Sequence, residues 1–150
     1  MHWYNKITGS IILVFLLSCA QPKQHAEIFA PGGNAIKGYD PVAFFTLGQP
    51  ILGFDRFSYS WKGARWLFSS EEDLTRFKDD PEKYAPQYGG FCAYGTANGH
   101  KAPTETETWT IVGDKLYFNY SSKVKEMWLK DQKALIEKAD KNWPTVKETD

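Results

Sequence analysis

The chain has 150 residues, of which 42% are hydrophobic and 16% aromatic, and its formal net charge is +0. This length is enough for one domain with a core of its own. Because basic residues are interspersed with acidic ones and form no stripe, the charge pattern argues against nucleic acid as a partner.

The N-terminus has the pattern of a lipoprotein signal peptide, which we assign to residues 1–18. Lys6 precedes an apolar run at residues 11–17, which is shorter than the roughly 20 apolar residues that cross a bilayer. The run ends in Leu-Leu-Ser-Cys, which resembles a bacterial lipobox, so we expect cleavage before Cys19 and lipid, such as palmitate, on its sulfur. Several acyl chains would hold the protein on the membrane. An uncleaved hydrophobic N-terminus is the alternative interpretation.

The predicted anchor sets the expected location and the cysteine chemistry. Gln21 is not an acidic retention signal, so in a Gram-negative cell we expect the outer membrane, with the protein facing the periplasm or the cell exterior. With lipid on Cys19, Cys92 is the only thiol left, and no intramolecular disulfide can form.

The mature chain divides into three predicted parts. Residues 19–35 are polar and contain Pro and a Gly-Gly pair, which predicts a flexible tether. Residues 36–144 carry the regular patterns of a folded domain. Residues 145–150 are expected to fray at the C-terminus.

The first half of the domain is predicted to form a hairpin followed by a helix. Residues 57–61 alternate between apolar and polar side chains, as in a half-buried strand, and residues 65–68 return after a Lys-Gly turn at residues 62–63. A helix then begins at Ser69 or Ser70, where carboxylates follow at capping positions, and ends near residue 78. Asp80-Pro81 starts another helical turn.

The second half repeats this arrangement. Polar residues 96–108 predict a surface loop, and residues 108–112 and 115–119 predict two strands joined by the two-residue turn Gly-Asp. A serine at 121 or 122 then caps a long helix that continues to about residue 140. The fold class is therefore α+β, a small single domain with two β-hairpins, each followed by a helix, and a long C-terminal helix.

Cys92 is the first candidate for a functional site. It follows Gly89 and Gly90, which have no side chains and therefore let backbone or ligand come close. A thiol in such a place can be a soft metal ligand or a reactive thiolate. The alternative, which the spacing by itself favours, is a small buried hydrophobic residue.

Four further residues are candidates for a site together with Cys92. His100 follows Cys92 by a short loop and could pair with it as ligand or base, or could simply be solvated. Asp40 could ligate or orient, or could be the turn residue that Asp before Pro often is. Tyr39 and Tyr94 are the aromatic neighbours expected beside a ligand. The cofactor of such a site would be a transition metal such as copper or zinc.

Several blocks of the chain resemble the YHS domain family. These blocks are Asp40-Pro41-Val42, residues 59–70, Phe77 and residues 80–84. Residues 38–45, 88–93 and 113–120 are similar to exported bacterial YHS-domain proteins, so the resemblance runs from about residue 36 to residue 144.

The YHS resemblance implies a small metal-binding module. The family carries cysteines in its Asp-Pro-Val-Cys and Phe-Cys-Ser motifs, and the corresponding positions here hold Ala43 and Ser69. Neither residue can replace a thiolate as a soft-metal ligand, so the metal site of the family does not carry over residue by residue.

Three functions are consistent with the sequence. The first is a lipid-anchored, non-enzymatic binding domain of the cell envelope, which holds a metal ion or small molecule near Cys92. The second is a thiol-dependent enzyme or redox protein that uses Cys92 with His100. The third is a structural or partner-binding lipoprotein in which Cys92 belongs to the core. The only partner that the sequence itself indicates is the membrane, through Cys19.

Overall fold

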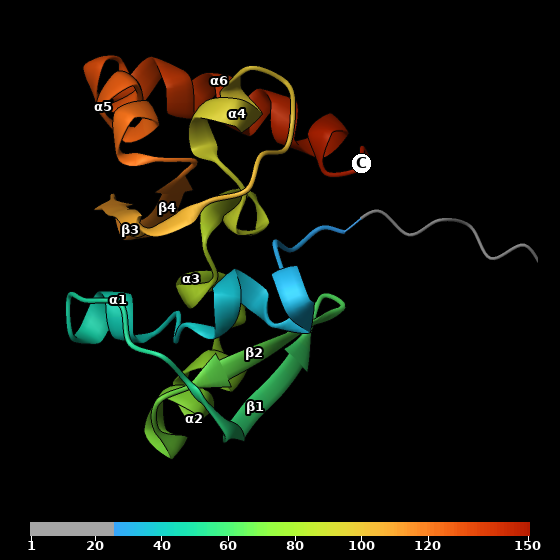
Figure 1. Ribbon diagram of the computed structural model, residues 1–150, viewed down its shortest axis with the longest axis vertical. Helices are drawn as coiled ribbons and strands as arrows, with labels where there is room; N and C mark the ends of the chain where they lie inside the picture. The colour runs from blue at the N-terminus through green and yellow to red at the C-terminus, as the bar shows by residue number, and fades with distance from the viewer. Residues whose placement is uncertain (1–25) are drawn as a thin grey trace, which may run out of the picture.

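The computed structural model describes residues 26–150, so the predicted signal peptide and Cys19 lie outside the described residues. The α+β prediction is confirmed: two antiparallel hairpins are each followed by a helix, and a long helix ends the chain (Figure 1). The elements, in order, are η1 (Pro31–Gly33), η2 (Ala35–Gly38), α1 (Ala43–Thr46), β1 (Phe54–Trp61), β2 (Ala64–Phe68), α2 (Glu71–Asp79), α3 (Pro81–Tyr84), η3 (Gln87–Gly90), α4 (Ala93–Ala97), β3 (Glu105–Val112), β4 (Lys115–Asn119), α5 (Ser122–Lys130) and α6 (Gln132–Val146).

The first hairpin has the predicted turn. Lys62 and Gly63 have φ values of 48° and 73°, and Trp61 pairs with Ala64 across them. Positive φ at both turn residues defines a type I′ turn, whose twist matches that of the two strands. Strand β1 begins at Phe54, three residues before the predicted start at residue 57. The pairing register shifts between Phe54 and Ser58, so the alternation of apolar and polar residues does not extend to the first residues of the strand.

Helices α2 and α3 begin directly after the capping residues that the sequence predicted. Ser70 Oγ accepts a hydrogen bond from the Asp73 N–H at 3.1 Å, so Ser70 is the N-cap of α2. Asp80 Oδ1 accepts from the Lys83 N–H at 3.3 Å and caps α3, with Pro81 in the first turn. Ser69, the other predicted cap, is instead directed towards Asp40.

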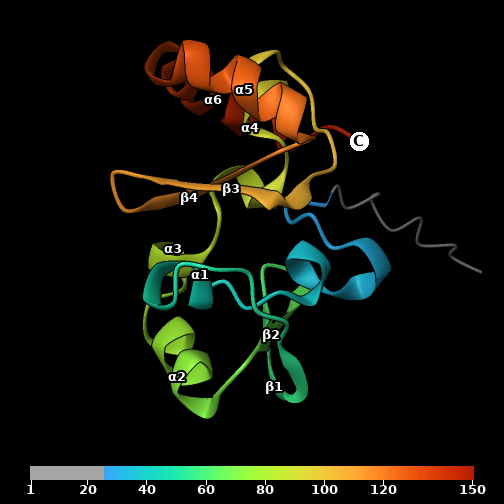
Figure 2. The ribbon, with the colours of Figure 1, turned by 60° about the vertical axis from the view of Figure 1, so that its left-hand side comes forward.

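Two hydrophobic cores lie on opposite sides of the β3–β4 hairpin. Figure 2 shows this hairpin between helices α4–α6 and the part of the chain that contains α1, α2 and the β1–β2 hairpin. Alternate side chains of β4 enter different cores: Leu116 and Phe118 pack into the first, and Tyr117 into the second. Residues 116–118 are all apolar or aromatic, as expected for a strand that is buried on both faces.

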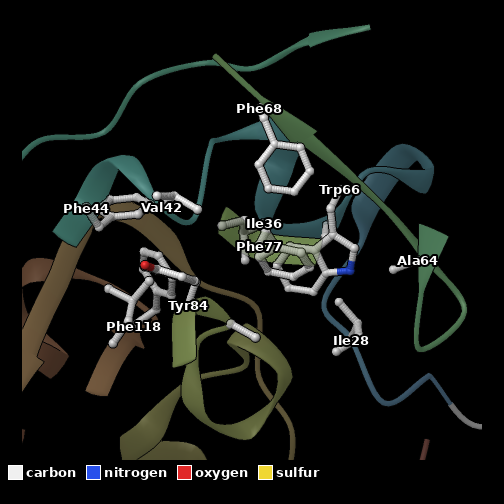
Figure 3. Close-up of a cluster of buried hydrophobic side chains, with 13 residues drawn as sticks. Ile28, Ile36, Val42, Phe44, Ala64, Trp66, Phe68, Phe77, Tyr84 and Phe118 are labelled. Carbon is white, nitrogen blue, oxygen red and sulfur yellow. The ribbon is translucent and has the colours of Figure 1, made fainter. Parts of the chain in front are cut away.

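The first core, shown in Figure 3, is rich in aromatic rings. Phe77 is fully buried, and its ring centroid lies 5.0 Å from that of Trp66 and 5.1 Å from that of Phe68. Phe118 reaches this core from β4. The fully or nearly buried members of the second core are Tyr88, Ala93, Ala97, Tyr117, Trp128 and Ala139.

The long helix predicted from residue 121 or 122 to about residue 140 is two helices. Ser121 caps α5 as predicted, accepting from the Val124 N–H at 3.3 Å. The chain leaves the helical conformation at Asp131, with φ −141° and ψ 43°, and α6 follows. The break lets Trp128 of α5 pack on Tyr117, with ring centroids 5.5 Å apart, while α6 packs along α4. One straight helix could not cover both surfaces.

The predicted boundaries of the folded part also differ from the structure at the N-terminal side. Residues 19–25 lie outside the described range, but the rest of the predicted tether is packed. Ile28 and Ala35 belong to the first core, and the Phe29 N–H donates to Gly89 O at 2.9 Å. The Pro and Gly residues that suggested flexibility instead form the turns η1 and η2, which let this segment fold back.

The C-terminal boundary differs as well. Helix α6 continues through Pro144 to Val146, which is buried. Lys101 Nζ then donates to Lys147 O at 2.9 Å and to Thr149 O at 2.6 Å. The residues predicted to fray are therefore held through their backbone carbonyl groups.

The predicted loop at residues 96–108 is shorter than expected, because β3 begins at Glu105 and α4 extends to Ala97. Thr104, Thr106 and Thr108 are buried in spite of their polarity. Thr108 Oγ1 compensates by donating to Asn119 O at 2.8 Å and accepting from the Asn119 N–H at 2.8 Å. Within residues 26–150, no helix has both the length and the hydropathy that crossing a membrane requires.

Candidate functional site

Cys92 lies in a closed, structural environment. It is 1% exposed, and its Sγ accepts hydrogen bonds from the backbone N–H groups of Gly95 at 3.4 Å and Tyr120 at 3.3 Å. The S–H donates to Asn119 Oδ1 at 3.6 Å. Burial raises the pKa of the Cys92 thiol, although the backbone hydrogen bonds oppose this effect. The environment thus stabilises the neutral thiol, which is not the nucleophilic form.

The groups around Cys92 do not fit a transition metal. Two of the sulfur's three hydrogen-bond neighbours are backbone N–H donors, and the third, Asn119 Oδ1, is the one oxygen among them. Asn119 Nδ2, which is buried without a partner among the described residues, is a donor as well. A metal ion needs lone pairs from its ligands. Within residues 26–150, no three His, Cys, Asp or Glu side chains are grouped so that they could hold a metal ion.

Gly89 and Gly90 do permit a close approach, as predicted, but the group that approaches is the chain itself. Both have positive φ, 62° and 87°. A Cβ on Gly89 would overlap with the carbonyl oxygen of Glu27, and one on Gly90 would lie 2.8 Å from Ile36 Cγ2. The glycine pair therefore accommodates the N-terminal segment of the domain.

Two of the remaining predicted site residues lie near Cys92, and two lie elsewhere. The backbone N–H of Tyr94 donates to Asn119 Oδ1 at 3.2 Å, the atom that also accepts from the Cys92 thiol, and His100 packs beside Gly95. His100 is exposed in the loop after α4, and its N–H donates to Gly95 O at 3.1 Å. Tyr39 is half-buried against the first core, whereas Tyr94 is half-buried against the second. Asp40 and Cys92 have no hydrogen-bond partner in common among those found within residues 26–150.

Asp40 is fully buried and acts as a turn residue. Its Oδ1 accepts from the N–H groups of Val42 at 2.9 Å and Ala43 at 3.3 Å. Its Oδ2 accepts from the Ser69 N–H at 2.8 Å and from Ser69 Oγ at 2.7 Å. These bonds connect the start of α1 to the end of β2, which compensates for burying the carboxyl group.

A second carboxyl group, which the sequence did not single out, lies next to Asp40. Asp73 is 7% exposed, and its Oδ2 lies 3.4 Å from Ser69 Oγ. Burial and the nearby Asp40 carboxyl group together raise the pKa of Asp73 to about 6. Because the sequence places Asp73 only among the acidic residues that begin α2, nothing in it predicted this pairing.

A cleft of about 270 Å³ is large enough to hold a small ligand. We call it the aromatic–acidic cleft. Four segments meet there: the N-terminal segment, the turn of the first hairpin, residues 82–89 and α6. The side chains that give the cleft its chemical character are Glu27, Trp61, Lys62, Glu82, Tyr88, Asp140 and Trp143.

One wall of the cleft carries an ion-pair network on an aromatic ring. Lys62 Nζ lies 3.1 Å from Glu27 Oε1 and 3.0 Å from Glu82 Oε1. The same ammonium group lies 4.6 Å from the ring centroid of Trp61, within the range of a cation–π interaction. Lys62 and Glu82 are exposed and Glu27 is half-buried, so water partly screens this network.

A second wall of the cleft pairs a carboxylate with two rings. The Tyr88 hydroxyl donates to Asp140 Oδ1 at 2.8 Å, and the rings of Tyr88 and Trp143 lie 5.9 Å apart. Burial and the neighbouring Asp140 raise the pKa of the Tyr88 hydroxyl, which keeps it a donor. Tyr88 also has a φ of 56°, a strained conformation for a bulky residue and one that is common at functional sites.

Residues 53–88 match the family model of the YHS domain. A YHS domain therefore lies at residues 53–88. Neither the comparison with curated proteins nor the comparison with solved structures gave a match. The YHS domain comprises the β1–β2 hairpin, α2 and α3. It supplies Trp61, Lys62 and Glu82 to the cleft, whereas Asp140 and Trp143 come from α6 outside it.

The two positions at which the resemblance to the YHS family implies cysteines, Ala43 and Ser69, come together in space but lack metal-binding side chains. Ala43 and Ser69 both contact the Asp40 carboxylate, Ala43 through its N–H at 3.3 Å and Ser69 through Oγ at 2.7 Å. The side chain of Ala43 is a methyl group without lone pairs, and the Ser69 hydroxyl already donates a hydrogen bond to Asp40. These side chains do not fit a thiophilic metal such as copper.

Proposed function

We propose that the protein is a lipid-anchored, non-enzymatic binding domain of the cell envelope, and that its ligand is a small molecule held in the aromatic–acidic cleft. The observation that carries the binding role is the cleft itself, in which rings and carboxylates from the YHS domain and from α6 face one space. Concave sites with a few convergent polar groups are where small ligands usually bind. The proposed anchor rests on the lipobox-like residues that end at Cys19.

Several features favour binding over thiol chemistry. Cys92 is buried, its pKa is raised, and its sulfur already accepts two backbone hydrogen bonds. His100 is exposed, and no hydrogen bond between its side chain and Cys92 is found within the described residues. A nucleophile needs an accessible thiolate and an adjacent base.

The anchor is tested in cells of a Gram-negative host. Wild-type protein should incorporate labelled palmitate and sediment with the outer membrane, whereas Cys19→Ala should carry no label. Cys92→Ala is the matched control, because it removes the other cysteine and should leave labelling unchanged. A wild-type protein without label, released by osmotic shock, would contradict the proposed anchor.

The binding role is tested on mature protein that is purified from membranes without chelator. Native mass spectrometry should detect a small-molecule adduct, and Trp143→Ala should lose it. Leu129→Ala, on the exposed side of α5, is the control and should keep the adduct. If elemental analysis instead finds one equivalent of metal that both variants retain, the cleft is not the binding site.

A further inference from the structure

The geometry points to a small organic ammonium ion as the ligand of the aromatic–acidic cleft, an inference that rests on the proposed function. The cleft is lined by three carboxylates, those of Glu27, Glu82 and Asp140, and by one cationic side chain, that of Lys62. Its charge is therefore negative even after the internal ion pairs are counted. A narrow space with acidic walls raises the local concentration of cations.

The first wall shows how the cleft holds an ammonium group, because one is already there. The Lys62 ammonium contacts carboxylates of Glu27 and Glu82 and lies over the Trp61 ring. Aromatic faces combined with carboxylates are the usual surroundings of bound ammonium ions in proteins. Since Glu82 has 73% of its side chain exposed, its carboxylate can still turn towards a ligand.

The second wall repeats these groups without a cation of its own. Asp140 accepts a hydrogen bond from Tyr88, and Trp143 lies beside them. No lysine or arginine within residues 26–150 forms an ion pair with Asp140. A ligand ammonium between Trp143 and Asp140 would therefore complete the arrangement that Lys62 completes on the other wall.

The size of the cleft limits the ligand. A space of about 270 Å³ holds roughly nine waters at about 30 Å³ each, which suits a molecule of the size of an alkylamine or a trimethylammonium alcohol. The source could be a free amine or the headgroup of a lipid. Glu27 follows Cys19 by eight residues, a span of at most roughly 28 Å, so a protein anchored at Cys19 would keep the cleft near the headgroups.

The first test compares a cation with its uncharged analogue. Choline and 3,3-dimethylbutan-1-ol have the same shape, so only the charge differs. Calorimetric titration of the mature protein should show choline binding at least tenfold more tightly than the alcohol. Trp143→Ala should weaken choline binding roughly three- to thirtyfold, as expected for the loss of one cation–π contact. Glu126→Gln, an exposed carboxylate on α5, should change nothing.

A second variant separates ligand binding from a structural role. Lys62→Asn removes the internal cation, and Asn-Gly is the preferred sequence for the type I′ turn at residues 62–63. Because Glu27 and Glu82 would then be uncompensated, choline should bind more tightly by about tenfold. A variant that merely damaged the cleft would bind choline less tightly.

The outcomes distinguish the inference from the proposed function. If the alcohol binds as tightly as choline and Trp143→Ala weakens both, the cleft is a binding site but the ammonium inference is wrong. If neither compound binds and no adduct is found, both fail. Glycerophosphocholine identifies the source: tighter binding than choline indicates a lipid headgroup, and equal or weaker binding indicates a free amine.

Discussion

Asp73 should make the free energy of unfolding depend on pH in an unusual direction. The pKa of this carboxyl group rises from the ordinary 3.8 to about 6 in the folded protein, because the group is buried beside Asp40. The folded state therefore binds more protons than the unfolded state between these two values, and stability falls as the pH rises from about 4 to about 6.5. The difference corresponds to about 3 kcal/mol at most, and to about 1–2 kcal/mol with solvent screening.

The matched variant is Asp73→Asn, which keeps the size of the side chain and an oxygen that can accept from Ser69 but does not titrate. At pH 7.5 it should be more stable than the wild type by about 1 kcal/mol, because losing a favourable charge at the start of α2 offsets part of the gain. At pH 4 this advantage should disappear. Glu71→Gln, an exposed carboxylate in the same turn, is the control and should show no such pH dependence.

The measurement is urea unfolding followed by tryptophan fluorescence at several values between pH 4 and pH 8. The informative quantity is the difference in unfolding free energy between Asp73→Asn and the wild type, because the contributions of groups remote from Asp73 cancel in it. A difference that stays constant across this range would refute the argument. It would mean that neither burial nor Asp40 raises the pKa of Asp73 in the folded protein.

Three further predictions concern packing. The Cys92 thiol should resist alkylation at pH 8 in the folded protein and react within minutes in urea, and rapid reaction in the native state would contradict its burial. Gly89→Ala should lower the unfolding free energy by at least about 2 kcal/mol, since it adds a clash with Glu27 to the strain of a positive φ. Gly99→Ala, with positive φ but open space, should cost about 1 kcal/mol in the same assay. Phe77→Ala should cost about 3–5 kcal/mol, and a loss below 1 kcal/mol would contradict the described first core.

The elements predicted correctly depend on neighbouring residues. The type I′ turn at Lys62-Gly63 and the caps at Ser70, Asp80 and Ser121 each arise from contacts within about one turn of chain. Such contacts are encoded in short stretches, so spacing and residue type are sufficient to find them.

The predictions that were wrong concern segments whose conformation depends on packing against distant parts of the chain. The predicted single C-terminal helix breaks at Asp131 because Trp128 and α6 pack on different surfaces. The folded part of the chain begins inside the predicted tether, because Ile28 packs into the first core. Local composition carries no information about these surfaces, which belong to other parts of the chain.

The sequence by itself determined the α+β class, the two hairpins, the helix starts and the presence of a YHS-like pattern, because each depends on residues that are close along the chain. Only the tertiary structure decided that Cys92 is enclosed, that Asp73 meets Asp40, and that Trp61 and Trp143 face one cleft. These relations join residues tens of positions apart. Their physical basis is packing between segments that are distant along the chain: β4 against Cys92, Asp40 against the start of α2, and α6 against the YHS domain, which no local pattern specifies.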